Sequence, residues 1–208
     1  MSSRFGSGYS RANLGKSWVL RRVNNSSIFQ LPTIPSTIPN AKQNEYCGPC
    51  CDTTQTSLHE ARAIVLQCMD FRLRDNTACH LNLLGYKNEY DECICAGCSL
   101  GYNELLPYSG WSRFIDEHIL LAYKLHNINE IKIIDHMKCG AYKSYYGPIT
   151  DIQEYKFHYK NLKKCADRLW LKFNPINGAV LKIPGLKIMT YILSIDASKM
   201  ENVYNKSE

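Results

Sequence analysis

The chain has 208 residues, of which 45% are hydrophobic and 21% are charged, and its formal net charge is +6. This length allows one domain with a substantial core, and no apolar run reaches the roughly 20 residues that a membrane-spanning helix needs. The N-terminus lacks the apolar stretch of a secretory signal. Ten cysteines are many for this length, but disulfide frameworks belong to small secreted chains. We therefore expect the cytoplasm or another reducing compartment, with an organelle or a virion as alternatives.

Residues 1–56 are predicted to form an extended, basic N-terminal arm, and residues 57–208 to form the folded domain. Three prolines between residues 31 and 40 favour extended backbone over helix. The charge pattern fits a transit peptide, an arm that docks on an acidic partner, or a solvated tail. No nucleic-acid recognition motif accompanies the charge, so specific nucleic-acid binding is not expected. Six basic residues precede the first acidic residue, Glu45: Arg4, Arg11, Lys16, Arg21, Arg22 and Lys42.

A cysteine-rich segment, Tyr46-Cys47-Gly48-Pro49-Cys50-Cys51, ends the arm. Cys47 and Cys50 are candidates for a second metal or thiol cluster. A redox dithiol of this spacing should follow a strand and open a helix, whereas a proline-rich segment precedes this one. Half of a structural zinc site is the second interpretation, with Cys93, Cys95 or Cys98 as partners. A turn with free thiols is the interpretation that we favour.

The rest of the chain alternates between apolar runs of strand length and helical patterns. This order predicts an α/β fold with a mainly parallel sheet of about four strands flanked by helices. Strands are predicted at residues 63–68, 92–96, 131–135 and 186–195. Helices are predicted at residues 58–62, 76–86, 112–126 (capped by Ser112) and 152–173, with loops at 100–110 and 178–185 and a polar tail after 196.

Two predicted helices have an apolar stripe that should face the core. In the helix at 112–126 the stripe includes His118, which we expect to be packed rather than to bind a metal. In the long helix, His158 and Cys165 are expected to be structural. The stripe of the first helix consists of Phe114, Ile115, His118, Leu121, Ala122 and Leu125, and that of the second consists of Tyr155, Tyr159, Leu162, Ala166 and Leu169.

Potential metal ligands stand at the ends of two predicted strands. Cys68 ends the apolar run 63–68, and His136 and Cys139 follow the run 131–135. Ligands bind outside the carboxyl ends of parallel strands, so these side chains can converge on one ion. Two thiolates and an imidazole leave one position open, as in a catalytic zinc site. The sequence therefore predicts one Zn²⁺ per chain.

The residues around these ligands resemble a known family. Cys68-Met69-Asp70-Phe71-Arg72 resembles the Cys-x-Asp-x-Arg motif of the β-class carbonic anhydrases, and His136-Met137-Lys138-Cys139-Gly140 resembles their His-x-x-Cys-Gly motif. The resemblance covers roughly residues 60–196 and is closest to the short, minimal members. It implies a β-carbonic-anhydrase-like fold. The family has an Asn-Ala-Gly turn after its second strand, whereas this chain has Cys95-Ala96-Gly97, which changes the pocket lining and brings the thiols of Cys95 and Cys98 near the site.

The resemblance implies a zinc lyase, a carbonate dehydratase that reversibly hydrates carbon dioxide to bicarbonate with a zinc-bound hydroxide as the nucleophile. Asp70 and Arg72 would be the catalytic pair, because an extended segment places both on the side of Cys68. Arg72 would hold Asp70 through a bidentate ion pair, and Asp70 would orient the hydroxide or, at low pH, take the fourth zinc position. Gly97 and Gly140 would line the substrate pocket. Flanking the site, Asp135 and Tyr142 are candidates for supporting the ligands.

Two alternatives remain open at the level of sequence. The same zinc hydroxide could hydrolyse carbon disulfide or carbonyl sulfide, a choice that depends on pocket shape. The chain could instead be a non-catalytic β-carbonic-anhydrase-like scaffold in a larger, possibly viral assembly. The resemblance also implies a homodimer or a higher oligomer, in which the N-terminal arm docks on a neighbouring subunit or on the assembly.

Overall fold

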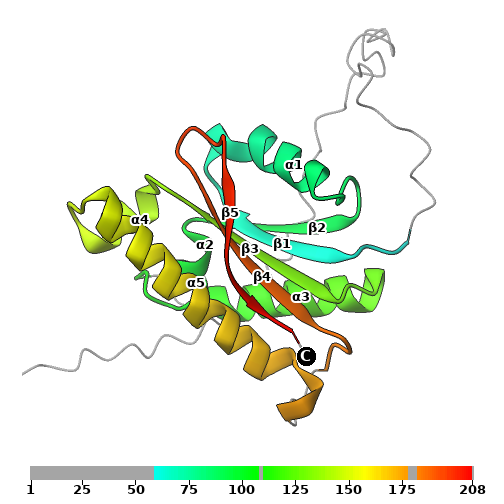
Figure 1. Ribbon diagram of the computed structural model, residues 1–208. Coiled ribbons are helices and arrows are strands. Elements are labelled where there is room, and N and C mark those ends of the chain that lie inside the picture. Colours follow the sequence, from blue (N-terminus) through cyan, green and yellow to red (C-terminus); the bar gives the residue numbers. More distant parts are fainter. Residues whose placement is uncertain (1–58, 108–109, 178–181, 208) are drawn as a thin grey trace, which may run out of the picture. The chain divides into compact units, whose positions relative to one another are not determined.

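The structure, a computed structural model, describes residues 59–107, 110–177 and 182–207. They form one five-stranded sheet with the strand order β2-β1-β3-β4-β5 (Figure 1). The predicted arm with Cys47 and Cys50 lies outside the described residues, so its separation from the domain stays a prediction. The strands are β1 (Ala63–Cys68), β2 (Tyr90–Cys95), β3 (Glu130–His136), β4 (Lys187–Leu193) and β5 (Met200–Lys206).

The sheet is mainly parallel. Strand β1 pairs in parallel with β2 on one side and with β3 on the other, and β3 pairs in parallel with β4. Only the last pairing within the described residues, between β4 and β5, is antiparallel. Every residue of β3 and the first five residues of β1 are buried, as expected for central strands that are covered on both faces. The predicted α/β fold class is confirmed.

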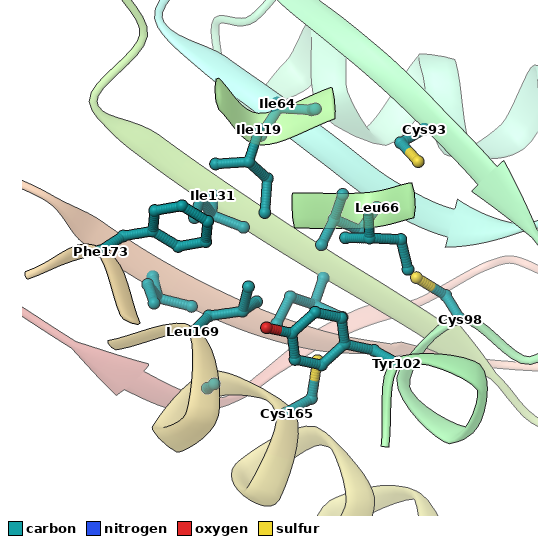
Figure 2. Close-up of a cluster of buried hydrophobic side chains, with 14 of the residues drawn as sticks. Ile64, Leu66, Cys93, Cys98, Tyr102, Ile119, Ile131, Cys165, Leu169 and Phe173 are labelled. Carbon is teal, nitrogen blue, oxygen red and sulfur yellow. The ribbon is translucent and has the colours of Figure 1, made fainter. Parts of the chain in front are cut away.

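Helices cover both faces of the sheet (Figure 1). One core lies between the sheet and α2, α3 and α5, and it contains Ile64, Leu66 and Ile131 of the strands (Figure 2). A second core lies against α1 and contains Ala63 and Val65. No helix in the described ranges is both long and apolar enough to cross a membrane. The helices are α1 (Arg74–Leu83), α2 (Cys98–Tyr102), α3 (Trp111–His126), α4 (Gly140–Tyr146) and α5 (Asp151–Phe173), with short 3-10 turns η2 (Phe71–Leu73) and η3 (Pro175–Asn177).

Several predicted elements were wrong in detail. The tail after residue 196 forms β5, whose polar sequence carries no strand signal and which is held by pairing with β4. Residues 59–62 are not helical, and residues 100–102 belong to α2 rather than to a loop. Helix α3 begins at Trp111 with Gly110, not Ser112, at its N-cap position. Helix α5 begins close to its predicted start because Thr150 and Gln153 form a capping box.

The buried side of α3 also differs from the prediction. Ile115, Asp116, Ile119 and Ala122 are buried, whereas the exposed fractions of Phe114, Leu121 and Leu125 are 46%, 52% and 64%. Asp116 turns inward because it accepts a hydrogen bond from the Tyr102 hydroxyl (2.9 Å) and pairs with Lys172. His118 is partly exposed, its ring packs against that of Phe114 with centroids 4.1 Å apart, and its Nδ1 donates to the carbonyl of Phe114. In α5, Leu162, Ala166 and Leu169 are buried as predicted, but Tyr159 is exposed, and His158 and Cys165 are fully buried.

A lysine is buried in the middle of the sheet. The Lys132 side chain is 1% exposed, and its Nζ lies 3.9 Å from the centroid of the Tyr86 ring and 3.8 Å from a carboxylate oxygen of Glu130. Tyr86 in turn donates a hydrogen bond to Glu130. Burial lowers the pKa of Lys132 to about 8, although the charge of Glu130 opposes this shift. The amine therefore loses its proton at a lower pH in the folded chain than in the unfolded chain.

This burial predicts a pH dependence of stability. Between pH 8 and about 10 the unfolded chain binds more protons at Lys132 than the folded chain does, so raising the pH stabilises the folded state. We expect the free energy of unfolding of the wild type to rise through this window relative to Lys132→Met, by at most about 1.4 kcal/mol per pH unit. Urea unfolding at several pH values measures the difference, and Lys156→Met at an exposed position is the control. Parallel pH profiles for wild type and Lys132→Met would contradict the prediction.

Candidate metal centre

Three of the predicted site residues meet at the carboxyl ends of β1 and β3. Cys68 is the last residue of β1, His136 is the last residue of β3, and Cys139 directly precedes α4. The turn between His136 and Cys139 includes Lys138 in the left-handed conformation (φ 59°). One possible ligand atom from each of the three side chains lies within 4.8 Å of the other two, and within the described ranges this is the sole group of three or more such residues.

The two thiols are spaced as a shared metal ion requires. Cys68 Sγ and Cys139 Sγ are 3.9 Å apart, much farther than the roughly 2.05 Å of a disulfide. Two thiolates in a tetrahedral zinc site, each about 2.3 Å from the ion, are about 3.8 Å apart. The separation therefore fits two ligands of one ion.

His136 presents a lone pair to the same place. Its Nδ1 lies 2.9 Å from the carbonyl oxygen of Met137, which can only accept, so Nδ1 carries the proton. Nε2 is then an acceptor, and it is buried without a hydrogen-bond partner in the part of the chain that the structure describes. An unpaired buried acceptor is costly, whereas the same orientation is the usual one for a metal-binding histidine. The donor set of the site thus fits a zinc ion.

The electrostatics of the thiols favour one negative charge before any ion binds. The hydrogen bond from Cys139 lowers the pKa of Cys68 to about 4. The same interaction, together with burial, raises the pKa of Cys139 above its usual value. Backbone contacts hold both residues, because Gly97 N–H donates to Cys68 Sγ (3.4 Å) and Cys139 N–H donates to Glu154 (3.1 Å). A dication beside both sulfurs would favour loss of the second proton.

Asp70 and Arg72 form the predicted bidentate ion pair. Arg72 Nε donates to Asp70 Oδ1 (2.9 Å) and Nη2 donates to Oδ2, and the Arg72 backbone N–H also donates to Oδ1 (3.1 Å). The pair forms in a 3-10 turn that Asp70 caps, so the expected extended geometry was wrong. The hydrogen bonds from Arg72 lower the pKa of Asp70 to about 2. Asp70 Oδ2 lies 3.9 Å from His136 Nε2, which places the carboxylate beside the three candidate ligands.

The two predicted pocket glycines have different surroundings. Gly97 has a positive φ of 51°, and a Cβ added there would lie 2.7 Å from Cβ of Ala141. A Cβ at Gly140 would meet no atom of the described residues within 4 Å. A small hollow lies beside Cys68, and neither glycine lines it; their role in a substrate pocket stays a prediction. The hollow is lined by Gln67, Cys68, Asp70, Leu73, Arg74, Thr77, Ile134, His136 and Leu193.

A buried polar network lies next to the ligands. Asp135, which precedes His136, accepts hydrogen bonds from Ser99 Oγ, Tyr142 Oη (2.8 Å) and His158 Nδ1 (3.0 Å). Burial raises the pKa of Asp135, but the hydrogen bonds from His158 and Ser99 outweigh it and hold that pKa below its usual value. Asp135 and Tyr142 were expected to flank the site. Sequence reasoning gave no role at the site to Ser99 and His158, because their pairing depends on tertiary contacts.

Comparison with known proteins identifies relatives of the chain. No family model matches it. An uncharacterized protein of Rickettsia conorii is 32% identical over 152 residues, which cover 71% of this chain and 75% of that protein. An uncharacterized protein of Rickettsia bellii is 31% identical over 154 residues, which cover 72% of this chain and 86% of that protein. The chain belongs to the family of these Rickettsia proteins. Neither relative has an assigned function.

Solved structures to which the chain is similar include three carbonic anhydrases. That of Glaciozyma antarctica is 14% identical, covering 73% of this chain and 88% of that one, with a TM-score of 0.45. The β-enzyme of Trichomonas vaginalis is 19% identical, with coverages of 72% and 87% and a TM-score of 0.44. A tetrameric β-enzyme of Sordaria macrospora is 13% identical, with coverages of 71% and 83% and a TM-score of 0.44.

The close approach of Gly97 to Ala141 predicts a large effect of a single methyl group. Gly97→Ala should destabilise the fold by about 2–4 kcal/mol, because left-handed backbone costs a non-glycine residue about 1–2 kcal/mol and overpacking adds to it. Gly85→Ala is the matched control, since Gly85 also has a positive φ (81°) but no atom of the described ranges lies within 4 Å of an added Cβ. Denaturant unfolding measures both. Equal losses in the two variants would contradict a steric contribution from Ala141.

Proposed function

We propose that the chain is a zinc-dependent carbonate dehydratase of the β-carbonic anhydrase type, with one Zn²⁺ held by Cys68, His136 and Cys139. The observation that carries the proposal is the buried Nε2 of His136, which has no hydrogen-bond partner among the described residues, beside two sulfurs that lie 3.9 Å apart. These residues occupy the ligand positions of the two motifs that resemble the β-class enzymes. Two thiolates and one imidazole leave a fourth position of a tetrahedral ion open for chemistry.

A bound Zn²⁺ would act as a Lewis acid that lowers the pKa of a water molecule toward neutrality. In this proposal, Asp70 orients that reacting water. Arg72 binds both oxygens of the Asp70 carboxylate and lowers its pKa to about 2. The carboxylate therefore stays ionised at neutral pH and well below it. A carboxylate held on one side by a guanidinium keeps a fixed orientation, so its free lone pairs can accept a hydrogen bond from the reactant and aim the nucleophile.

The residues around the ligands fix their positions. The Met137 carbonyl selects the tautomer of His136, and Glu154 anchors the backbone of Cys139. Asp135 connects β3 to Ser99 of α2, Tyr142 of α4 and His158 of α5. The segment with His136 and Cys139 is therefore held by three helices. Such supporting contacts typically change metal affinity or activity by about 10- to 100-fold when they are removed.

The hollow beside Cys68 has both apolar and charged residues in its lining. Leu73, Ile134 and Leu193 contribute apolar side chains to this lining, and Asp70 and Arg74 contribute charged ones. This combination fits carbon dioxide, an uncharged electrophile whose product is the anion bicarbonate. Carbonyl sulfide and carbon disulfide share these properties, so hydrolysis of these sulfur analogues is the second candidate reaction. Stopped-flow measurement of carbon dioxide hydration alongside sulfide release distinguishes the two.

Metal analysis tests the ligand set. The purified wild type should contain about one zinc per chain, and its zinc affinity should fall as the pH is lowered, because protons compete for the ligands. Cys139→Ser should lose the metal and the hydration activity, whereas Cys79→Ser, at an exposed free cysteine, should keep both. A zinc-loaded wild type that hydrates carbon dioxide no faster than the uncatalysed rate would refute the enzyme and favour a scaffold.

Substitution of Asp70 separates metal binding from catalysis. Asp70→Asn should keep about one zinc per chain but lower kcat/KM for hydration by about 10²- to 10⁴-fold, because the amide cannot replace the ionised acceptor. Arg72→Lys should lower kcat/KM by a smaller factor. The lysine ammonium keeps the positive charge beside Asp70, but it cannot bind both carboxylate oxygens. Arg113→Lys, which alters the exposed pair with Glu117, is the control. Full activity of Asp70→Asn would exclude the orienting role.

A scaffold in a larger assembly and a homodimer or higher oligomer are compatible with the same fold. Within the described residues, the apolar side chains Phe114, Leu121 and Leu125 of α3 are exposed, so the domain has surface that a second subunit can cover. Exposed apolar surface is common in soluble proteins, so these side chains are weak evidence for an assembly. Catalysis at the zinc site is therefore the better supported proposal. The thiol ligands need a reducing compartment.

A further inference from the structure

A second pair of thiols lies beside the candidate metal centre. The segment Cys95-Ala96-Gly97-Cys98 connects the last residue of β2 to the first residue of α2. Gly97, with its positive φ, makes the turn between the two cysteines. A Cys-x-x-Cys segment that follows a strand and opens a helix in a βαβ fold is the arrangement expected of a redox-active dithiol. Cys95 and Cys98 therefore have the strand-to-helix context that a redox interpretation of Cys47 and Cys50 would require.

The two thiols differ in accessibility. Cys95 is partly exposed, whereas Cys98 is fully buried. Figure 2 shows the Cys98 side chain beside Leu66 in the larger core. The two cysteines are separated by only two residues, and interaction with the Cys95 thiol, together with burial, raises the pKa of Cys98 well above its usual value. An accessible thiol with a protonated, buried neighbour is the arrangement in which the first thiol reacts with an oxidant and the second completes the disulfide.

The pair is connected to the candidate metal centre through the backbone. Cys95 is the register partner of Cys68 in the parallel pairing of β1 with β2, and Met69 N–H donates to the Cys95 carbonyl (3.2 Å). The Gly97 amide, which lies between the two cysteines, donates to Cys68 Sγ (3.4 Å). Neither Cys95 nor Cys98 belongs to the group of candidate metal ligands. A change in the turn therefore reaches the sulfur of Cys68 without involving a metal ligand directly.

We propose that Cys95 and Cys98 form a reversible disulfide that weakens metal binding at Cys68, His136 and Cys139. The disulfide itself is independent of the proposed function, whereas its effect on the metal rests on that function. A disulfide requires the two sulfurs to approach to about 2.05 Å, which tightens the turn and displaces the amide of Gly97 from Cys68. Loss of such a contact to a ligand lowers metal affinity by about tenfold or more.

The oxidant is a low-molecular-weight disulfide such as oxidised glutathione. The Cys95 thiolate attacks one sulfur of the oxidant, forms a mixed disulfide and releases one glutathione thiolate. Cys98 then loses its proton and attacks the Cys95 sulfur, which breaks the mixed bond and releases the second glutathione. Two cysteine thiols are oxidised, one disulfide is reduced, and the two thiol protons end on the two glutathione molecules. An excess of a small dithiol reverses the exchange.

The first experiment maps the disulfide in the full-length, zinc-supplemented protein. The wild type is equilibrated in glutathione buffers, its free thiols are blocked with N-ethylmaleimide, and unreduced peptides are analysed by mass spectrometry. We expect an internal Cys95–Cys98 disulfide, and in Cys98→Ser a lasting glutathione adduct on Cys95. The exposed Cys79 provides an internal control for simple thiol oxidation. Separate alkylation of Cys95 and Cys98 under conditions that oxidise Cys79, or a bond from either cysteine to Cys68, would refute the disulfide.

The second experiment measures zinc transfer to a chromogenic chelator. The zinc affinity of the oxidised wild type should be about tenfold lower than that of the reduced wild type. A small dithiol should restore the original affinity. The double variant Cys95→Ser/Cys98→Ser should not respond to glutathione. An unchanged affinity after complete oxidation would refute the coupling. If the reduced wild type binds no zinc, the proposed function and the coupling both fail, whereas a mapped Cys95–Cys98 bond still supports the dithiol.

Discussion

The candidate metal centre depends on the parallel pairing of β1 with β3. The register aligns Gln67 with Ile134, so the residues that follow each strand reach the same edge of the sheet. Cys68 and His136 come from segments far apart in the sequence and meet because of this pairing alone. A shift of one residue in either strand would turn its side chains to the opposite face. Complete burial of β3 specifies this register, because a shift would move its apolar residues away from the core that they fill.

The same edge of the sheet concentrates buried polar groups, which are costly unless each finds a partner. Asp135 is fully buried and accepts three side-chain hydrogen bonds, and the Tyr142 ring also packs against His158 with centroids 3.7 Å apart. Satisfied networks of this kind hold side chains in one arrangement. The loop between β3 and α4 therefore has a rigid base, whereas His136 Nε2 is left without a hydrogen-bond partner. That contrast makes the imidazole of His136 a candidate ligand rather than a structural histidine.

The sequence predicted the parts of the fold that depend on short-range patterns of apolar residues. The apolar runs of β1 and β3 and the cysteines and histidine that follow them were found because buried parallel strands are continuously apolar. The face of α3 was misassigned because Asp116 turns inward to Tyr102 and Lys172, which no periodicity reports. Strand β5 was missed because its partner supplies its stability. The contacts of Ser99, Glu154 and His158 near the site come from helices that only tertiary packing brings to β3.

Two thiol pairs next to each other create a problem of selectivity. Cys68 and Cys139 are close enough that a small movement would join their sulfurs, and an ion shared between them would occupy the lone pairs that such a reaction needs. Cys95 is partly exposed and has no place in that ligand group, so an oxidant would reach it while the ligands are occupied. The chain has cysteine at the position where the β-class motif has asparagine, and this one change places a reactive sulfur next to the candidate metal ligands. Redox sensitivity is therefore a property that the resemblance to that class does not predict.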